Sequence, residues 1–194
     1  MSEEQKRPPE GREENLSGGD AFKVDLYFWL QALVMALVSL ILLFTFVGRV
    51  IGVQGSSMVP TLHDKDMLLL QSIGHEPKPG DIVVLTKESF MAQPIVKRVI
   101  AVGGQTVDID YAAGTVAVDG VALEEDYINE AMYELPPDYA THVEVPEGSI
   151  FVMGDNRNKS SDSRDPRLGT VDVRYVLGRA RFVLLPFQDF GVIE

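Results

Sequence analysis

One long apolar segment stands near the start of the chain, and it differs from every hydrophobic run that follows. Residues 27–47 read YFWLQALVMALVSLILLFTFV and contain no charged side chain. About 21 residues at 1.5 Å per residue are enough for a helix to cross the roughly 30 Å hydrocarbon core of a bilayer. Tyr27 and Trp29 suit the membrane interface at the start of the segment. The pattern therefore predicts a transmembrane helix over residues 27–48.

Two other interpretations of this segment are less favoured. A cleavable signal peptide has a basic start, a shorter apolar region and a small-x-small cleavage site, whereas here an acidic tail precedes the segment and VGRVIGVQG follows it. A buried core helix usually shows a polar stripe, which this segment lacks. The flanking charges, Lys23 and Arg49, do not decide the orientation of the helix.

Beyond residue 48 the hydrophobic positions form short β-branched runs separated by turn residues. Runs of this length and spacing predict a mainly β fold, a single domain over residues 49–194 built of short, bent antiparallel strands. The expected strands lie within residues 50–55, 66–73, 80–86, 94–102, 105–110, 114–120, 141–145, 149–155 and 174–185.

Two stretches of the β region have a distinct local character. Thr115–Val118 alternates cleanly and ends at Asp119-Gly120, a dipeptide that supplies the positive φ of a tight hairpin turn. Residues 124–139 lack strand texture, and we expect a loop or a short helix there.

Composition limits the classes of function that the chain can have. Residues 1–26 are rich in Glu, Pro, Gly and Ser, which predicts a flexible tail. The net charge is −12, with four basic against seven acidic residues in this tail and 13 against 22 in the remainder. Nucleic acid is not an expected partner, because its binding depends on cationic groups that displace counterions from phosphates.

The chain has no cysteine, which excludes disulfides, thiolate zinc sites and a thiol nucleophile. A hydroxyl nucleophile remains open. Ser57 lies where a predicted strand runs into a Pro-containing turn, a place from which a hydroxyl can project. Serine beside Gly and Pro is more often simple turn chemistry, so this segment alone does not indicate catalysis.

A serine hydroxyl needs a base to take its proton. The chain offers three histidines, and none lies in a recognisable triad context. His63 and His75 stand beside charged residues, which is typical of solvated surface histidines, and the third is His142. A lysine can replace histidine where burial disfavours its charged form and lowers its pKa.

Lys97 is the candidate lysine, because it interrupts the apolar run at residues 94–102. On β alternation it shares a face with Ile95 and Val99, and its neighbour Arg98 faces the other way. The alternative is an edge-strand lysine that blocks sheet aggregation, and the pattern alone favours that alternative.

A third segment, residues 154–167, is crowded with small polar groups and opposite charges: Gly-Asp-Asn-Arg-Asn-Lys-Ser-Ser-Asp-Ser-Arg-Asp-Pro-Arg. Such groups can satisfy one another through Asx turns and Arg–carboxylate forks. A solvated loop is the alternative, and composition does not exclude it.

Taken together, four segments resemble the successive motif boxes of the bacterial type I signal peptidases, in the same order and after a membrane segment. The first is Gly-x-Ser-Met-x-Pro-Thr-Leu around Ser57, and the last is Gly-Asp-Asn-Arg-x-x-Ser-x-Asp-Ser-Arg. The resemblance extends from about residue 27 to residue 187, and the four boxes occupy residues 55–62, 80–83, 97–103 and 154–164.

The resemblance implies a membrane-anchored serine endopeptidase that removes signal peptides from preproteins through an acyl-enzyme. It makes Ser57 the nucleophile, Lys97 the general base and Ser160 the residue that orients the lysine. It also implies that the reaction uses no metal and no cofactor.

Four charged residues have supporting roles in the resemblance. Asp162 with Arg164 matches a supporting ion pair, and Asp155 with Arg98 matches residues that brace the site from behind. One position departs from some members of the family, chiefly Gram-negative ones, which carry an oxyanion-binding serine where this chain has Gly55. The chain is more similar to the short Gram-positive form, and its second oxyanion donor is unassigned.

We expect the substrate to bind by β-augmentation, as an extended peptide laid beside the strand before Ser57 and the segment from Gln93 to Val96. Shallow apolar pockets there would fit small side chains. The expected substrate-binding residues are Gly55, Met58, Gln93, Ile95 and Val96.

The implied arrangement places the 1–26 tail in the cytoplasm and the 49–194 domain on the outer face of the bacterial cell membrane. The expected partners are signal-peptide-bearing preproteins, the lipid bilayer, where Met58 would sit at the surface, and the export machinery. Two rivals are a self-cleaving SOS-type repressor, which the membrane helix and acidic tail disfavour, and a non-catalytic, membrane-tethered β domain.

Overall fold

A computed structural model describes residues 18–46, 48–72, 74–133 and 138–193, and the chain divides into two units between Leu42 and Leu43. The first unit consists mainly of a long helix, α1, at Gly18–Phe46. Its apolar stretch Phe22–Leu42 has a mean hydropathy of 1.9, is long enough to cross a membrane, and none of it is buried. The predicted helix is confirmed, and exposure contradicts the alternative of a buried core helix.

The helix begins nine residues earlier than the sequence pattern predicts. Extending a helix that has already formed adds a hydrogen bond for each residue ordered, so it can continue past the apolar stretch. Residues 18–26 of the predicted tail are therefore helical, and residues 1–17 lie outside the described residues.

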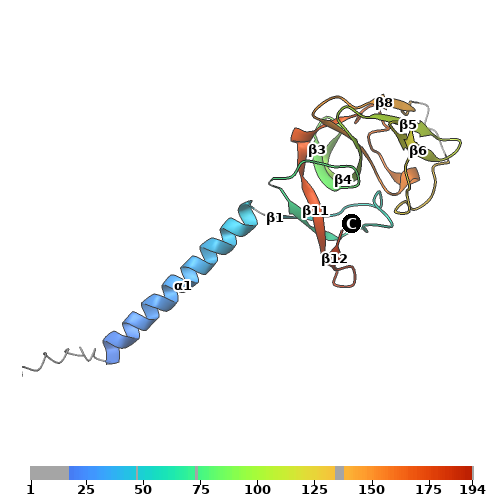
Figure 1. Ribbon diagram of the computed structural model, residues 1–194. Helices are drawn as coiled ribbons and strands as arrows, with labels where there is room; N and C mark the ends of the chain where they lie inside the picture. Colours follow the sequence, from blue (N-terminus) through green and yellow to red (C-terminus); the bar gives the residue numbers. More distant parts are fainter. Residues whose placement is uncertain (1–17, 47, 73, 134–137, 194) are drawn as a thin grey trace, which may run out of the picture. The chain divides into compact units, whose positions relative to one another are not determined.

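The second unit is mainly antiparallel β structure, as the sequence predicts. Within the described residues, eight strands form one sheet in the order β1-β2-β11-β3-β4-β9-β10, with β12 beside β11, and four form a second sheet in the order β7-β6-β5-β8 (Figure 1). The strands are β1 Gly48–Gly52, β2 Met67–Gln71, β3 Ile82–Lys87, β4 Met91–Val102, β5 Thr106–Asp110, β6 Thr115–Val118, β7 Val121–Ala122, β8 His142–Glu144, β9 Ser149–Met153, β10 Val171–Asp172, β11 Val176–Leu185 and β12 Gly191–Val192, with 3-10 turns η1 Arg157–Lys159 and η2 Val173–Tyr175.

The first four residues of β3 and residues 95–101 of β4 are buried on both faces, which explains why apolar residues predominate there. Val84 and Val96 pair directly and belong to one apolar cluster, whereas Leu85 and Ile95 pair directly and belong to another. A third cluster joins the second sheet to β9 through Phe151. The centre of the larger sheet is therefore the least hydrated part of the domain.

Each of the nine predicted runs overlaps a strand, and the Asp119-Gly120 turn is confirmed by positive φ angles of 51° and 78° between paired strands β6 and β7. Three strands of two residues each, β7, β10 and β12, were beyond prediction because they are too short to show alternation. Residues 124–133 contain neither helix nor strand, which confirms the loop over the short helix for that part.

Candidate active site

Ser57 and Lys97, which are 40 residues apart in the chain, meet in the structure. Lys97 Nζ donates a hydrogen bond to Ser57 Oγ at 2.7 Å and a second to the carbonyl oxygen of Val96 at 2.9 Å. Lys97 is only 3% exposed. A lysine that blocks sheet aggregation points into solvent, so the alternative of such an edge-strand lysine is wrong.

Strand register separates the two adjacent cations of β4. Lys97 lies opposite Val83, whose cluster also contains Ile95 and Val99, as the predicted alternation requires. Arg98 lies opposite Ile82, which belongs to the other cluster. The two positive charges leave the strand on opposite faces.

Burial controls the charge of Lys97. Loss of water around the side chain lowers its pKa from 10.5 to about 8, with a smaller contribution in the same direction from Arg164. Asp162 and Asp155 oppose this change, because a negative charge favours the ammonium form. An amine with this pKa is partly neutral near pH 8 and can accept a proton.

The turn that carries Ser57 is fixed by local hydrogen bonds. Gly55 has a φ of +85°, a conformation that favours glycine, and its N–H donates to Asp64 Oδ1 at 2.8 Å. One turn later, Leu62 N–H donates to the carbonyl oxygen of Met58 at 2.9 Å. Met58 itself is 1% exposed and packs in the core with Val53, so its predicted place at the bilayer surface is wrong.

The loop after β9 holds the Ser57 turn from the other side. Asn156 N–H donates to the carbonyl oxygen of Ser57 at 3.0 Å, and its side-chain amide donates to that of Ser56 at 3.1 Å. At Gly154 a Cβ would lie 2.5 Å from Ser57 O and 2.3 Å from Ser160 Oγ. Glycine is therefore required where the loop packs against the nucleophile turn.

Asp155 and Arg98 form a buried, two-pronged ion pair behind the dyad. Arg98 Nε donates to Asp155 Oδ1 at 2.9 Å, and Nη2 donates to Oδ2 at 2.8 Å. Thr61 Oγ1 donates to the same carboxylate at 2.5 Å, and Arg98 Nη1 donates to the carbonyl oxygen of Gly80 at 3.0 Å. The pair thus joins all four motif segments.

Asp162 and Arg164 form a second pair of this kind, with two contacts of 2.8 Å. Burial alone would raise the pKa of Asp162, but the charge and hydrogen bonds of Arg164, together with the Gly154 N–H, lower it below 3.8. Ser160 is buried nearby, yet no hydrogen bond joins its hydroxyl to Lys97, so its predicted orienting role stays a prediction.

These contacts overturn the solvated-loop alternative for residues 154–167. Asp155 and Asp162 have no exposed surface, and Arg157 and Arg164 are each 2% exposed. Charged groups tolerate such burial where each is paired and hydrogen-bonded.

The strand edge beside the dyad is open. Strand β9 pairs with β4 only from Arg98 onward, so among the described residues the part of β4 before Arg98 has a strand, β3, on one side only. Gln93 is exposed on this free edge, while Ile95 and Val96 are buried below it. Among the described residues, this edge of β4 has backbone groups that no neighbouring strand pairs, close to the dyad.

The histidines do not contact the dyad. His63 and His142 are exposed, and His142 pairs with Asp108 at 2.6 Å. His75 contradicts the expectation of a solvated residue, because its side chain is 10% exposed and lies 3.0 Å from Asp81. Asp81 is buried and also pairs with Arg179 at 2.8 Å. Because His75 contacts this buried carboxylate, His75 is largely buried as well.

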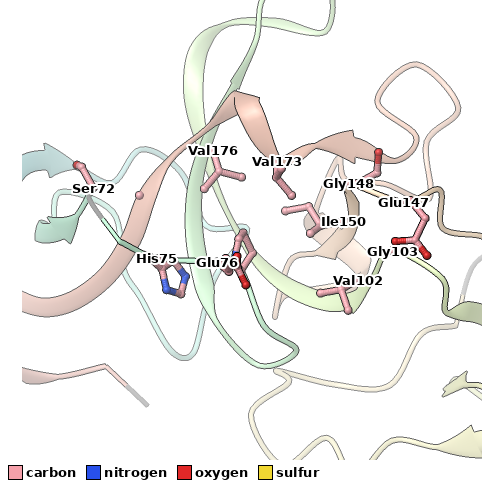
Figure 2. A pocket seen from close by; sticks show the side chains of 13 residues that line it. Ser72, His75, Glu76, Val102, Gly103, Glu147, Gly148, Ile150, Val173 and Val176 are labelled. Carbon is pink, nitrogen blue, oxygen red and sulfur yellow. The ribbon is translucent and has the colours of Figure 1, made fainter.

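A cavity of about 540 Å³ lies apart from Ser57 and Lys97 (Figure 2). His75 and Glu76 line one side and Glu147 another, with apolar walls that include Val102 and Ile150, and neither Ser57 nor Lys97 reaches it. No cluster of three His, Asp or Glu side chains within the described ranges could hold a metal ion there or elsewhere.

Several residues around the dyad were not predicted. Thr61 and Asn156 lie inside the motif segments. The signal that could have identified them is a polar side chain within a turn that becomes buried. Glu125 and Tyr127 pack near Arg98 and Arg157, but they come from a segment without periodicity and gave no signal.

Comparison with known proteins supports the family resemblance. A family model described as signal peptidase, peptidase S26, matches residues 26–185. The chain is 36% identical over 178 residues to a signal peptidase I of Bacillus licheniformis, covering 86% of this chain and 92% of the relative. It is 38% identical over 170 residues to a probable signal peptidase I-1 of Synechocystis, covering 82% of each. A crystal structure of a signal peptidase I from Enterococcus faecalis is 31% identical, with a TM-score of 0.43, and covers 54% of this chain and 97% of its own.

The Asp162–Arg164 pair should be far more important for stability than an exposed pair of the same spacing. Asp162→Asn leaves the buried Arg164 without its counter-charge, so we expect the free energy of unfolding to fall by about 3 kcal/mol or more. Asp172→Asn is the matched control, since Asp172 contacts Arg174 with the same i, i+2 geometry on the surface. Denaturant unfolding checks both variants, and equal losses would contradict the assignment.

Proposed function

Because this chain belongs to the signal peptidase family S26 and acts as a serine endopeptidase that removes signal peptides, we propose that Ser57 is its nucleophile and Lys97 its general base. The observation that carries the proposal is the 2.7 Å contact between Lys97 Nζ and Ser57 Oγ in a buried site. A hydroxyl and an amine of lowered pKa at this distance are the two groups that acyl transfer needs.

The proposed reaction proceeds through an acyl-enzyme. Neutral Lys97 takes the Ser57 proton as Oγ attacks the scissile carbonyl carbon, and the C–O bond forms. The ammonium of Lys97 then gives this proton to the leaving amine as the C–N bond breaks. Lys97, neutral again, takes a proton from water as the water oxygen attacks the acyl carbon, and it gives that proton to Ser57 Oγ as the acyl C–O bond breaks.

Stabilisation of the oxyanion falls to backbone donors. The Ser57 N–H has no protein acceptor among the described residues and is free to donate to the oxyanion. The Gly55 N–H is already bonded to Asp64, so it is not the second donor while that contact persists.

Substrate recognition by β-augmentation is supported by the free edge of β4. An extended peptide that pairs with residues 93–96 would pass beside Ser57, with its alternate side chains directed toward Ile95 or Val96. Gly55 is exposed on the other side of the nucleophile turn and leaves room for the peptide backbone. Met58 lies in the apolar wall below, as part of the cluster that contains Val96.

Membrane anchoring is the second part of the proposal. The 21-residue apolar stretch of α1 supports it, and residues 49–194 are then the catalytic domain on the outer face of the membrane, where exported chains emerge. The cytoplasmic tail over residues 1–26 and association with the export machinery belong to the same proposal.

An apolar surface on the catalytic domain supports contact with the lipid bilayer. Val50, Leu69, Phe182 and Val192 lie in one cross-strand row over β1, β2, β11 and β12, and Phe182, Val50 and Val192 are 37%, 43% and 66% exposed. The opposite face of these strands fills the core. A half-exposed sheet normally has a polar outer face, so an apolar row indicates a covering partner.

The hairpin loop between β11 and β12 extends this surface with two aromatic residues. Phe187 is 83% exposed and Phe190 is 61% exposed. Strand β1, which starts the row, begins at Gly48, two residues after α1 ends at Phe46. Along the chain this surface starts directly after the proposed membrane helix, so lipid is the apolar partner that we propose for it.

Loss of either member of the dyad should abolish cleavage. Ser57→Ala and Lys97→Met are each expected to lower the rate of preprotein cleavage by about 10⁴-fold or more. Lys97→Met also removes the cost of burying an amine, so its melting temperature at pH 7 should equal or exceed that of the unmodified chain. Lys78→Met, at an exposed lysine, is the control and should retain full activity. Cleavage by either dyad variant would refute the mechanism.

Removal of the two loop aromatics should weaken lipid binding. Transfer of a phenylalanine side chain out of water contributes about 2 kcal/mol, so Phe187→Ser with Phe190→Ser should lower vesicle binding of the 49–194 domain at least tenfold. Val121→Ser, at a residue 69% exposed on β7, is the matched control and should bind as before. Co-sedimentation with phospholipid vesicles measures the effect. Equal binding by both variants, or no binding by the unmodified domain, would contradict the lipid surface.

A further inference from the structure

Residues 125–133, which lie outside all four motif segments, pack along the loop that carries the catalytic charges. Glu125 Oε2 accepts a hydrogen bond from Arg157 Nη1 at 2.9 Å, and its other oxygen accepts one from Arg157 Nη2. The Arg157 side chain has no exposed surface, and that of Glu125 is 7% exposed. The segment therefore begins with a third buried ion pair.

Tyr127 covers two guanidinium groups. The centre of its ring lies 4.1 Å from Arg98 Cζ and 5.9 Å from Arg157 Cζ. Burial and the neighbouring Glu125 raise the pKa of Tyr127 to about 12, so its hydroxyl stays protonated and donates to Glu125 Oε1 at 3.0 Å. The ring face attracts the cation beneath it and shields it from water.

The rest of the segment is bonded to the same loop. Asn129 N–H donates to the carbonyl oxygen of Asp155 at 3.1 Å. The side chain of Asn158 donates to the carbonyl oxygen of Ala131 at 3.0 Å and accepts from Tyr133 N–H at 3.3 Å. Contacts thus run from one end of the segment to the other, and they hold both the backbone and the charges of the catalytic loop.

We propose that the 125–133 segment is a positioning element for the dyad, and that Tyr127 is its central residue because it holds Arg98 against Asp155. This inference rests on the proposed roles of Ser57 and Lys97. Tyr127 touches no reacting atom; it acts through Arg98.

The effect on Lys97 follows from charge. The groups that face Lys97 are Asp155, Asp162 and Arg164 from the loop after β9 and the Ser57 hydroxyl from the turn. While Arg98 donates two hydrogen bonds to Asp155, the positive charge of Arg98 largely balances the negative charge of that carboxylate. Without the ring above it, Arg98 is hydrated and less firmly held, and Asp155 then acts more strongly on Lys97. A less compensated carboxylate favours the ammonium form and raises the pKa of the lysine.

The test is the pH dependence of kcat/KM for preprotein cleavage by the full chain in detergent. In the unmodified enzyme we expect activity to fall as pH decreases below about 8, because Lys97 becomes protonated. In Tyr127→Leu the pH below which activity falls should be about one unit higher, which lowers activity at pH 7 about tenfold. Near pH 10, where Lys97 is neutral in both enzymes, the ratio of the two activities should return toward one.

Two control variants isolate the ring face. Tyr127→Phe keeps the ring and loses only the hydroxyl, so its pH profile should match that of the unmodified chain. Tyr175→Leu makes the same change as Tyr127→Leu at an exposed tyrosine of η2 and should leave the profile unmoved. If Tyr127→Leu does not fold, Tyr127→Met replaces it, because a flexible thioether fills the space without a π-face.

A Tyr127→Leu profile that is unmoved, or an activity ratio that is constant from pH 6 to pH 10, would overturn the inference. A constant ratio is the result of a merely structural role, since it reflects the fraction of folded enzyme. Failure of the proposed dyad looks different: the unmodified enzyme would then show no fall in activity near pH 8, or Lys97→Met would remain active.

Discussion

An amine in water keeps its proton at neutral pH, and the site depends on the burial that removes water from Lys97. Desolvation is the largest influence on this side chain and lowers its pKa to about 8. Two carboxylates nearby act in the opposite direction, and unpaired they would stabilise the ammonium form. Among the described residues, both of these carboxylates and that of Glu125 are instead paired with a guanidinium, as Arg98–Asp155, Arg164–Asp162 and Arg157–Glu125. The lysine therefore lies among charges that largely cancel, and desolvation determines the protonation state of Lys97.

The fold provides this burial and also the geometry of the nucleophile. Lys97 extends from the buried part of β4, and Ser57 is held by a turn whose backbone is bonded to Asn156. The absence of a side chain at Gly154 lets these two backbones approach. Because Arg98 neighbours Lys97 in β4, and Asp155 neighbours Gly154, which packs against the Ser57 turn, the segments that hold the dyad also supply its neutralising pair.

The β runs, the hairpin at Asp119-Gly120 and the alternation around Lys97 could be predicted because they are local patterns of period two. The burial of the loop after β9 could not, since Arg98 and Asp155 are 57 residues apart and Arg157 and Glu125 are 32 residues apart. Composition made that loop look solvated, and only pairing across the fold shows otherwise. Met58 was misplaced for a related reason: whether a residue beside a turn faces the core depends on how the turn packs. The row of exposed apolar residues over β1, β2, β11 and β12 needs strand register, which the sequence does not reveal.

The ordered motif segments identified the family and the dyad, and the structure adds the physical state of the lysine. The most direct test of that state is the titration of Lys97 by NMR in the full chain, with ¹³C-labelled lysine side chains and Lys97→Met to assign the signal. The Lys97 side chain is expected to titrate with a pKa of about 8. A Lys97 signal that titrates near 10.5, the ordinary value for a lysine, would contradict the account.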